Sequence, residues 1–507
     1  MLDSSARADN DASRPADPGS PLRAWVCGII SLVCIATVML LNQTESTPSA
    51  TKSAAKAAAP LSTELDPSDP FVMSAKVVAK LAYDLRPQDE GTRQMLLTQM
   101  ESPYGDRKPD AIEQVRRAIV TAEILREKGA AEAEKTFAAL EAEFAERPDR
   151  EARALEPEEK EEIDGVSADI AALRTVYARG TLDEAARERL IARHGWFARV
   201  AMTYGQPDTD PARVDLLGGG LVLFSLLIGI IFVMLGGVVA GFACFVVAIV
   251  LFATGRMRPR FVKPAPGGSF GWELLAGFTF TFLAFKLIIW GVVLATTGQG
   301  GTPPSWLPTG VLLGQWTVAL AVFTPVLLGV SFAQWRALSG WTAPRGVLRE
   351  LGAGVFGYLA GLPLVIGALI VSLVVDRIYL SVTGQGARDS SNPILELASK
   401  SDAFTLVLLF SLATVWAPLV EETVFRGGMY RALRTRLHAI LAGLISAVCF
   451  GVMHGYPLTL LGPVMAIGLT FALMREWRGS IIGPAFGHFL NNATVLGLLF
   501  VVMALAK

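Results

Sequence analysis

Acidic residues are scarce over more than half of this chain, because only nine of its 46 Asp and Glu residues lie after Asp215. Together with a hydrophobic content of 52%, that scarcity excludes a wholly soluble enzyme and a disordered protein. Cysteine is also rare. The four cysteines all lie in apolar runs, which excludes a disulfide-stapled secreted domain and favours packing roles (Cys27, Cys34, Cys244 and Cys449). The net charge of −1 gives no indication of a nucleic-acid partner.

The part of the chain before Asp215 divides into four stretches of different composition. Residues 1–22 are polar and contain several Pro and Ser, which predicts a disordered tail. Residues 23–42 are apolar, and no small-residue cleavage site follows closely, so we expect a retained membrane anchor. Residues 43–68 have the composition of an Ala/Ser/Thr/Pro linker. Residues 69–213 space their apolar residues three and four apart among Glu, Lys and Arg, which predicts a soluble helical domain.

Hydrophobic segments follow one another through residues 215–507, and with the anchor they amount to about ten spans. Long uncharged stretches in lipid must be helical, because every backbone polar group needs an internal partner. The fold class is therefore all-α: a polytopic helical membrane protein with a soluble helical domain inserted after the first span. We expect residues 215–254 to form two spans that turn near Gly236 and Gly237.

Arginine-rich loops alternate with loops that lack basic residues, such as residues 297–308. By the positive-inside rule, the arginine-rich loops face the cytoplasm. If residues 215–254 are a hairpin, the soluble domain is cytoplasmic too, whereas one long span would remove that inference. We expect an integral multi-pass protein, in the cell membrane if its source is bacterial.

Charged residues at the centre of an apolar helix cost about 2.5–3.5 kcal/mol, so those that persist indicate function. Glu421 and Glu422 follow sixteen uncharged residues, TLVLLFSLATVWAPLV. Glu422 and Arg426 are four apart, share a helix face and can pair. Glu421 is rotated about 100° away, and a carboxylate without its own arginine in an apolar cavity suits a general base. A helix-end ion pair beside a solvated glutamate is the alternative interpretation.

Two histidine motifs, FGVMH at residues 450–454 and HFLNN at residues 488–492, each place their outer residues on one helix face. If the chain turns near Leu437, Glu421 lies sixteen residues before the turn and His454 seventeen after it. Both would then lie about 25 Å from the turn on antiparallel helices. A carboxylate, two imidazoles and an amide could therefore converge within the bilayer, although a single histidine at such a helix end is more often structural.

The segments EETVFR, FGVMH and HFLNN resemble the EExxxR, FxxxH and HxxxN motifs of the CPBP family. That family is the type II CAAX prenyl protease and bacteriocin-processing (Abi) group of intramembrane endopeptidases. The resemblance covers about residues 400–505 and implies hydrolysis of a peptide bond in a membrane-associated protein or peptide. It implies that Glu421 activates a water with His454 as its partner, while His488 and Asn492 stabilise the oxyanion.

The same resemblance implies that Glu422 and Arg426 brace the site, and Arg426 could also meet a substrate carboxylate. A second version of the chemistry lets His454, His488 and a glutamate bind Zn²⁺, which would polarise the water. Because Asn492 is a poor zinc ligand, we expect glutamate catalysis without a required cofactor, although metalloprotease is the family's common label.

Two other functions fit the sequence. A non-catalytic immunity or scaffold protein would keep the polar cluster as a packing core, and a proton-coupled transporter would use it as a relay. A transporter should show paired broken helices in two related halves, whereas this chain has a single polar cluster. The soluble domain at residues 69–213 could recruit or restrict substrates by binding a protein partner, and its only histidine, His194, is expected to be structural.

Overall fold

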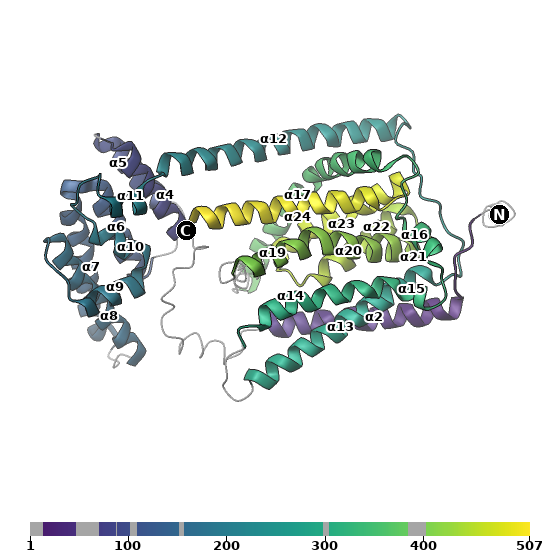
Figure 1. The fold of residues 1–507 in the computed structure, drawn as a ribbon, viewed down its shortest axis with the longest axis horizontal. Coiled ribbons are helices and arrows are strands. Elements are labelled where there is room, and N and C mark those ends of the chain that lie inside the picture. The colour runs from purple at the N-terminus through teal and green to yellow at the C-terminus, as the bar shows by residue number, and fades with distance from the viewer. Residues whose placement is uncertain are drawn as a thin grey trace. The chain divides into compact units, whose positions relative to one another are not determined.

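A computed structural model describes residues 14–46, 70–87, 89–101, 109–151, 157–297, 304–383 and 402–506. Within these ranges every regular element is helical, which confirms the all-α class (Figure 1). The chain divides into two compact units. The bundle unit comprises Pro48–Phe232 and Val501–Lys507, and the membrane unit comprises Met1–Thr47 and Val233–Phe500. Most of the linker predicted at residues 43–68 lies outside the described ranges.

The bundle unit contains amphipathic helices whose apolar faces surround a core that includes Phe71, Phe137 and Phe197. Asp110 begins one helix with a capping box, because its side chain accepts from the Glu113 N–H and the Glu113 side chain accepts in return. The helices of this unit are α4 (Pro70–Leu85), α5 (Glu90–Glu101), α6 (Ala111–Leu125), η2 (Arg126–Lys128), α7 (Gly129–Glu151), α8 (Pro157–Tyr177), α9 (Glu184–His194), α10 (Trp196–Met202) and α11 (Pro211–Leu217).

A buried carboxylate, Asp169 of α8, ties α8 to α9. Its Oδ2 accepts from Arg193 Nη1 at 2.6 Å and lies 3.2 Å from His194 Nε2. Burial lowers the pKa of His194, so the ring is neutral and donates its Nε2–H to Asp169. These contacts give His194 a role in packing the bundle.

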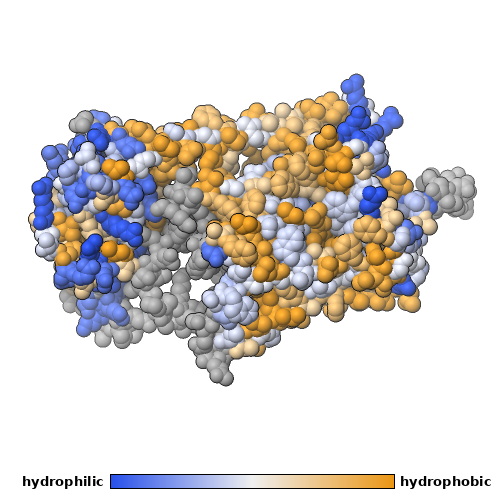
Figure 2. All heavy atoms as spheres, in the orientation of Figure 1, coloured by the Kyte–Doolittle hydropathy of each residue, from blue (hydrophilic) through white to orange (hydrophobic). Residues whose placement is uncertain are grey.

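Eight helices of the described residues are long and apolar enough to cross a membrane, and α22 adds a shorter apolar helix. The membrane helices are α2 (Pro21–Ser46), α12 (Gly220–Ala253), α13 (Phe270–Thr297), α14 (Leu307–Val318), η3 (Ala319–Phe323), α15 (Thr324–Leu327), α16 (Phe332–Ser339), α17 (Val347–Thr383), α19 (Ala403–Ser411), η4 (Leu412–Trp416), α20 (Ala417–Glu421), η5 (Glu422–Met429), α21 (Tyr430–Arg434), α22 (Ala439–Met453), α23 (Leu458–Arg478) and α24 (Ile482–Ala506). Apolar side chains cover most of their visible surface, as expected for an integral multi-pass protein (Figure 2).

The segment predicted as a hairpin is one helix. α12 continues through Gly236 and Gly237 for 34 residues, a length of about 51 Å at 1.5 Å per residue. The glycines do not break it, because a helix keeps each backbone polar group paired in lipid whereas a turn would leave several unpaired. The prediction of two spans at residues 215–254 is therefore wrong, and the inference that the inserted domain is cytoplasmic loses its basis.

Residues 14–20, part of the predicted disordered tail, are folded against the membrane unit. The Pro18 carbonyl accepts from the Ser269 N–H at 2.8 Å. Asp17 accepts from both Nε and Nη2 of Arg431, at 3.1 and 2.6 Å, and both side chains are buried. The prediction of disorder is wrong for this stretch, because a buried ion pair and backbone bonds offset the entropy lost on ordering it.

Several arginines of the membrane unit lie at one end of its helices. Three of them pair there with acids from other elements (Arg431 with Asp17, Arg434 with Glu476, Arg478 with Glu350). Helix α2 starts at this end and lies alongside α13 (Figure 1). At its other end the Asn42 side chain lies against Gly455 and accepts a hydrogen bond from Lys286. Gly455 therefore marks the end of the unit opposite to the arginines.

Candidate active site

The predicted catalytic residues come from three parts of the membrane unit. Glu421 ends α20 and is followed directly by η5, His454 caps the C-terminus of α22, and His488 lies in α24. Helix η5 is π-helical, since its last N–H donation spans five residues, from Tyr430 to Phe425. A π turn is wider than an α turn and changes the angle between successive side chains. The carboxylates of Glu421 and Glu422, although adjacent in sequence, can therefore both lie near His488.

The most deeply buried part of the site is an ion pair. Arg426 Nη1 donates to Glu422 Oε1 at 2.9 Å, and neither residue is exposed. His488 Nδ1 lies 3.0 Å from the same oxygen. Because a carboxylate only accepts, His488 carries a proton on Nδ1 and donates it to Glu422. The predicted pairing of Glu422 with Arg426 is present, and His488 joins it from another helix.

Arg426 is fully buried and contacts a backbone carbonyl and two aromatic rings. Its Nη2 donates to the Gly468 carbonyl at 2.9 Å. Its guanidinium lies 4.5 Å from the ring centre of Phe450 and 5.4 Å from that of Phe471. A cation held between two aromatic faces and fully buried cannot reach a substrate carboxylate, so that suggested role is not supported. The sequence motifs did not identify Gly468 or Phe471, which lie outside them.

Glu421 faces both histidines. Its Oε2 lies 3.9 Å from His454 Nε2 and 3.9 Å from His488 Nε2. Both distances exceed a direct hydrogen bond, and this buried oxygen has no hydrogen-bond partner in the structure. A polar contact beyond about 3.5 Å is commonly bridged by water. The arrangement leaves Glu421 Oε2 as an acceptor to which a small hydrogen-bond donor could bind.

The contacts of His454 determine which ring nitrogen carries the proton. The other nitrogen faces Glu421 as an acceptor. Its Nδ1 lies 2.7 Å from the Phe450 carbonyl, which can only accept, so Nδ1 carries the proton in the neutral ring. Nε2 is then bare and faces the Glu421 carboxylate, so two acceptors confront each other. Tyr456 stacks on the ring with centroids 5.4 Å apart and helps to hold its orientation.

Asn492, the last of the predicted site residues, makes two hydrogen bonds through its side-chain amide. Its Nδ2 donates to the Ala413 carbonyl at 2.7 Å, and its Oδ1 accepts from Asn491 Nδ2 at 3.0 Å. The hydrogen bonds that the structure gives Asn492 thus go to η4 and to its own neighbour.

The suggested zinc ligands do not form a metal site in this arrangement. Across the described residues, no group of three or more His, Cys, Asp and Glu is arranged to hold a metal ion. Tetrahedral ligands at the usual Zn–N and Zn–O lengths are about 3.3 Å apart, whereas Glu421 Oε2 is 3.9 Å from each imidazole of His454 and His488. Two imidazoles and a carboxylate are chemically suitable ligands, but the two carboxylate–imidazole distances here are wider than those of a tetrahedral zinc site.

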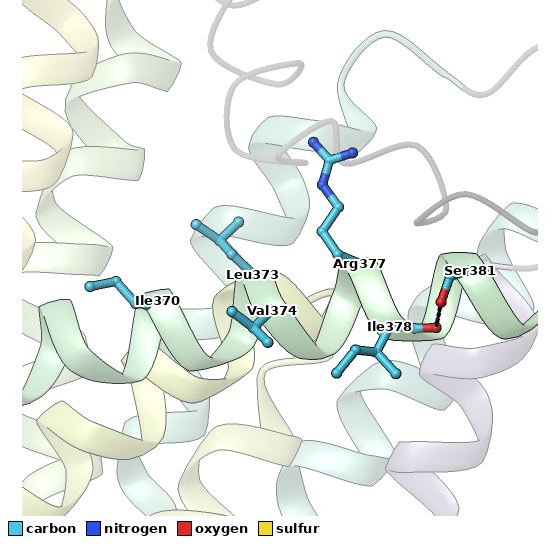
Figure 3. Close-up of a pocket in the computed structure, with 6 residues that line it drawn as sticks. All are labelled: Ile370, Leu373, Val374, Arg377, Ile378 and Ser381. Carbon is cyan, nitrogen blue, oxygen red and sulfur yellow. Dashed lines mark hydrogen bonds between the residues drawn. The ribbon is translucent and has the colours of Figure 1, made fainter.

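A separate shallow pocket lies along α17 and has a volume of about 420 Å³. Its walls come from one helix, and the Ser381 hydroxyl donates to the Ile378 carbonyl at 2.7 Å (Figure 3). Its lining residues are Ile370, Leu373, Val374, Arg377, Ile378 and Ser381. None of them is an acid or a histidine, so this pocket offers no carboxylate–imidazole pair of the kind found in the Glu421 cluster.

The fold and this cluster define a polytopic membrane protein with a carboxylate–imidazole site buried among its helices. A sequence model of type II CAAX prenyl endopeptidase Rce1-like proteins matches residues 403–494, a range that contains all six predicted site residues. The chain belongs to this family, which confirms the resemblance of its three motifs.

Two relatives support the assignment. The chain is 28% identical over 222 residues to "Putative membrane peptidase YdiL" of Bacillus subtilis (strain 168), covering 43% of this chain and 85% of that protein. It is 30% identical over 168 residues to an uncharacterized 24.3 kDa protein of Escherichia coli, covering 32% of this chain and 70% of that protein. No solved structure matches the chain.

The buried ion pair leads to a stability prediction. Arg426→Met leaves the Glu422 charge buried without its cation, so we expect a loss of about 3–5 kcal/mol and a lower melting temperature in detergent. The double variant Glu422→Gln/Arg426→Met removes both charges and should lose less. Arg336→Met, at an exposed arginine, is the matched control and should melt like the parent. Equal losses in the single and double variants would contradict this account.

Proposed function

We propose that this protein is an intramembrane endopeptidase in which Glu421 and His454 activate the attacking water. The proposal is supported above all by Glu421 Oε2, a buried acceptor without a partner that lies 3.9 Å from two imidazole nitrogens. A single water can donate one hydrogen to Glu421 and the other to His454 Nε2, which satisfies both acceptors. Its oxygen lone pair is then free to attack.

The reaction needs no atoms beyond the peptide and this water. The water oxygen bonds to the carbonyl carbon of the scissile peptide while Glu421 takes a proton as general base. Collapse of the tetrahedral intermediate breaks the C–N bond, and Glu421 returns the proton to the departing nitrogen. The products are a carboxylate and an amine. His454 holds the water through its bare Nε2 and orients it.

His488 is the candidate for stabilising the oxyanion. The site contains two carboxylates, Glu421 and Glu422, and one permanent cation, Arg426. Because Nδ1 of His488 donates to Glu422, an oxyanion donor at Nε2 requires the form of the ring that carries a proton on both nitrogens; this Nε2 lies 3.9 Å from Glu421 Oε2. A preorganised donor at a developing oxyanion is among the larger contributions to catalysis, about 10²–10³-fold. Glu422 and Arg426 fix the position of this imidazole.

The substrate class follows from the family and the environment. The family model is described as type II CAAX prenyl endopeptidase Rce1-like, and one relative is named "Putative membrane peptidase YdiL". For this chain we propose a peptide bond of a membrane-associated protein or peptide. The position of the Glu421 oxygen favours this function over an immunity or scaffold role, because this buried acceptor faces two imidazoles without a direct hydrogen bond to either. A transporter is disfavoured by the same comparisons.

The first test replaces the two residues that hold the water. Glu421→Gln and His454→Ala should each lower cleavage of a membrane-protein substrate by at least about 10²-fold, while the protein accumulates in membranes at the parent level. His438→Asn is the matched control, since it removes an exposed histidine and keeps a residue that can cap α22. Parent-level cleavage by both site variants would refute the proposal.

Metal dependence gives a separate test. Because the ligand spacing is too wide for zinc, purified protein treated with 1,10-phenanthroline and then dialysed should keep its full activity. Metal analysis of the active preparation should find far less than one zinc per chain. Loss of activity that returns specifically with Zn²⁺ would replace the glutamate mechanism with a metal-assisted one.

The membrane topology indicates where substrates arrive. Helix α2 starts at the arginine-rich end and finishes with Asn42 beside Gly455. The chain therefore leaves α2 on the membrane side opposite to the arginines, and the single helix α12 carries it back to the basic loop at residues 256–263. Since arginine-rich loops face the cytoplasm, we propose that the inserted helical domain is extracytoplasmic. Substrates presented on that side fit this topology better than cytoplasmic CAAX proteins.

Cysteine labelling tests this topology. Glu188→Cys in the inserted domain and Arg258→Cys in the basic loop lie at exposed positions, and the four native cysteines would be replaced by serine. In intact cells a membrane-impermeant maleimide should label position 188 and not position 258, and both should react after permeabilisation. The reverse pattern would place the inserted domain in the cytoplasm.

A further inference from the structure

One corner of the membrane unit, away from the active site, carries positive charge and apolar side chains together. Residues 344–349, between α16 and the first turn of α17, are all exposed. Arg345 and Arg349 flank Leu348, which is 83% exposed. Neither guanidinium forms an ion pair with an acid of the described residues, and the adjacent acid, Glu350, is buried in another pair. The corner therefore presents two uncompensated cations beside an apolar side chain.

This corner lies where α17 enters the bilayer. Residues 351–375, between Glu350 and Asp376, contain no charged residue, and a helix of that length spans about 38 Å at 1.5 Å per residue. The hydrocarbon core of roughly 30 Å takes up most of this length, so residues 344–349 lie at the depth of the lipid headgroups. The pairing of Glu350 with Arg478 places them at the arginine-rich end of the unit.

An anionic phospholipid matches both parts of this surface. A guanidinium binds a phosphate through paired, charge-assisted hydrogen bonds. Each arginine close to an anionic membrane surface strengthens binding by about fivefold. A free phosphate would satisfy the two arginines and leave Val347 and Leu348 uncovered, whereas the acyl chains of a lipid cover apolar side chains at this depth. The surface therefore favours a lipid over a soluble anion.

Two contacts connect the backbone before this corner to η5, the helix that carries the buried ion pair of the active site. Trp341 Nε1 donates to Thr423 Oγ1 at 2.9 Å. Four residues further along η5, Gly427 lies so close to the Ser339 carbonyl that an added Cβ would be 2.9 Å from its oxygen. Thr423 and Gly427 each follow directly after a residue of the ion pair. A shift of Trp341 would therefore be felt by the pair.

The segment is attached to the bundle of helices at both of its ends. The Gly340 carbonyl accepts from the Ile481 N–H at 2.9 Å. At the other end, Glu350 accepts from Arg478 Nε and Nη2, at 3.0 and 2.6 Å. A ligand that holds the exposed residues between these attachments limits the movement of the whole segment, including the Trp341 side chain that contacts η5.

We propose that residues 344–349 bind an anionic phospholipid, with Arg345 and Arg349 on its headgroup phosphate and Leu348 against its acyl chains. The bound lipid holds Trp341 on Thr423 and thereby stabilises η5 in the arrangement that the active site requires. The binding site stands independently of the proposed function, whereas the effect on cleavage rests on it.

Photolabelling tests the binding site. A phosphatidylglycerol with a photoactivatable headgroup, added to the full-length protein in phosphatidylcholine nanodiscs, should label the peptide that contains residues 344–349. Unlabelled phosphatidylglycerol should compete, and glycerol phosphate should not. Arg345→Gln/Arg349→Gln should lower the labelling at least about tenfold. Arg256→Gln/Arg258→Gln removes two exposed arginines of another loop and should keep it.

Three results would overturn the site: labelling that survives Arg345→Gln/Arg349→Gln, labelling that falls equally in the control variant, or competition by glycerol phosphate. The last result would replace the lipid by a soluble anion. If the double variant does not fold, Arg345→Gln alone should lower the labelling about fivefold, and an unchanged signal would count against the site in the same way.

Cleavage in two lipid compositions tests the coupling to η5. Adding phosphatidylglycerol to phosphatidylcholine nanodiscs should raise the kcat/KM of the parent several-fold. Arg345→Gln/Arg349→Gln should lose most of this rise, and Arg256→Gln/Arg258→Gln should keep it. Trp341→Phe keeps an aromatic ring but removes the N–H that Thr423 accepts, so it should keep the photolabelling and lose the rise. A parent-like rise in Trp341→Phe would overturn the coupling.

The photolabelling does not depend on cleavage. If the parent cuts no substrate in either lipid composition, the proposed function fails while the lipid site is still tested. If the parent cuts its substrate equally well in both compositions, the proposed function stands and the lipid effect on η5 is overturned.

Discussion

The buried pair of Glu422 and Arg426 is the interaction on which the rest of the site depends. Removing two charges from water costs several kcal/mol per ion, and their attraction offsets this only when the remaining polar atoms are also served. Here three other helices supply part of that service: the Gly468 carbonyl and Phe471 ring of α23, the Phe450 ring of α22 and His488 of α24. Glu422 Oε2 and Arg426 Nε have no hydrogen-bond partner among the described residues. The pair therefore fixes the relative positions of four elements. The imidazole of His488 is held in position by its hydrogen bond to Glu422.

The convergence of this cluster could be predicted from the sequence, because spacings of four residues place partners on one helix face and equal distances from a turn place them at one depth. The pairing of Glu422 with Arg426 and the approach of Glu421 to His454 follow from those two rules. The way in which Glu421 reaches His488 does not follow, because an α-helix would turn it about 100° from Glu422. Two π-helical stretches, η4 and η5, supply the difference, and nothing in the residue pattern except Pro418 signals them.

Two other features of the fold could not be predicted from local composition. Gly236 and Gly237 looked like a turn, yet in lipid a turn exposes backbone groups that a helix keeps paired, so α12 continues through them. The composition of residues 14–20 predicts disorder, yet Asp17 forms a buried ion pair with Arg431. In both cases the deciding interaction involves a partner or a solvent that local sequence does not contain. The family model matches residues 403–494 and therefore does not include Asp17, the partner of Arg431.

The short length of α22 determines where His454 lies in the membrane unit. Its fifteen residues span about 22 Å, and the helix ends at His454, one residue before the Gly455 that lies beside Asn42 of α2. Gly455 is exposed in the membrane unit, and His454 keeps 24% of its side chain accessible. The end of this helix thus places the His454 imidazole at a partly accessible position beside the Glu421 carboxylate.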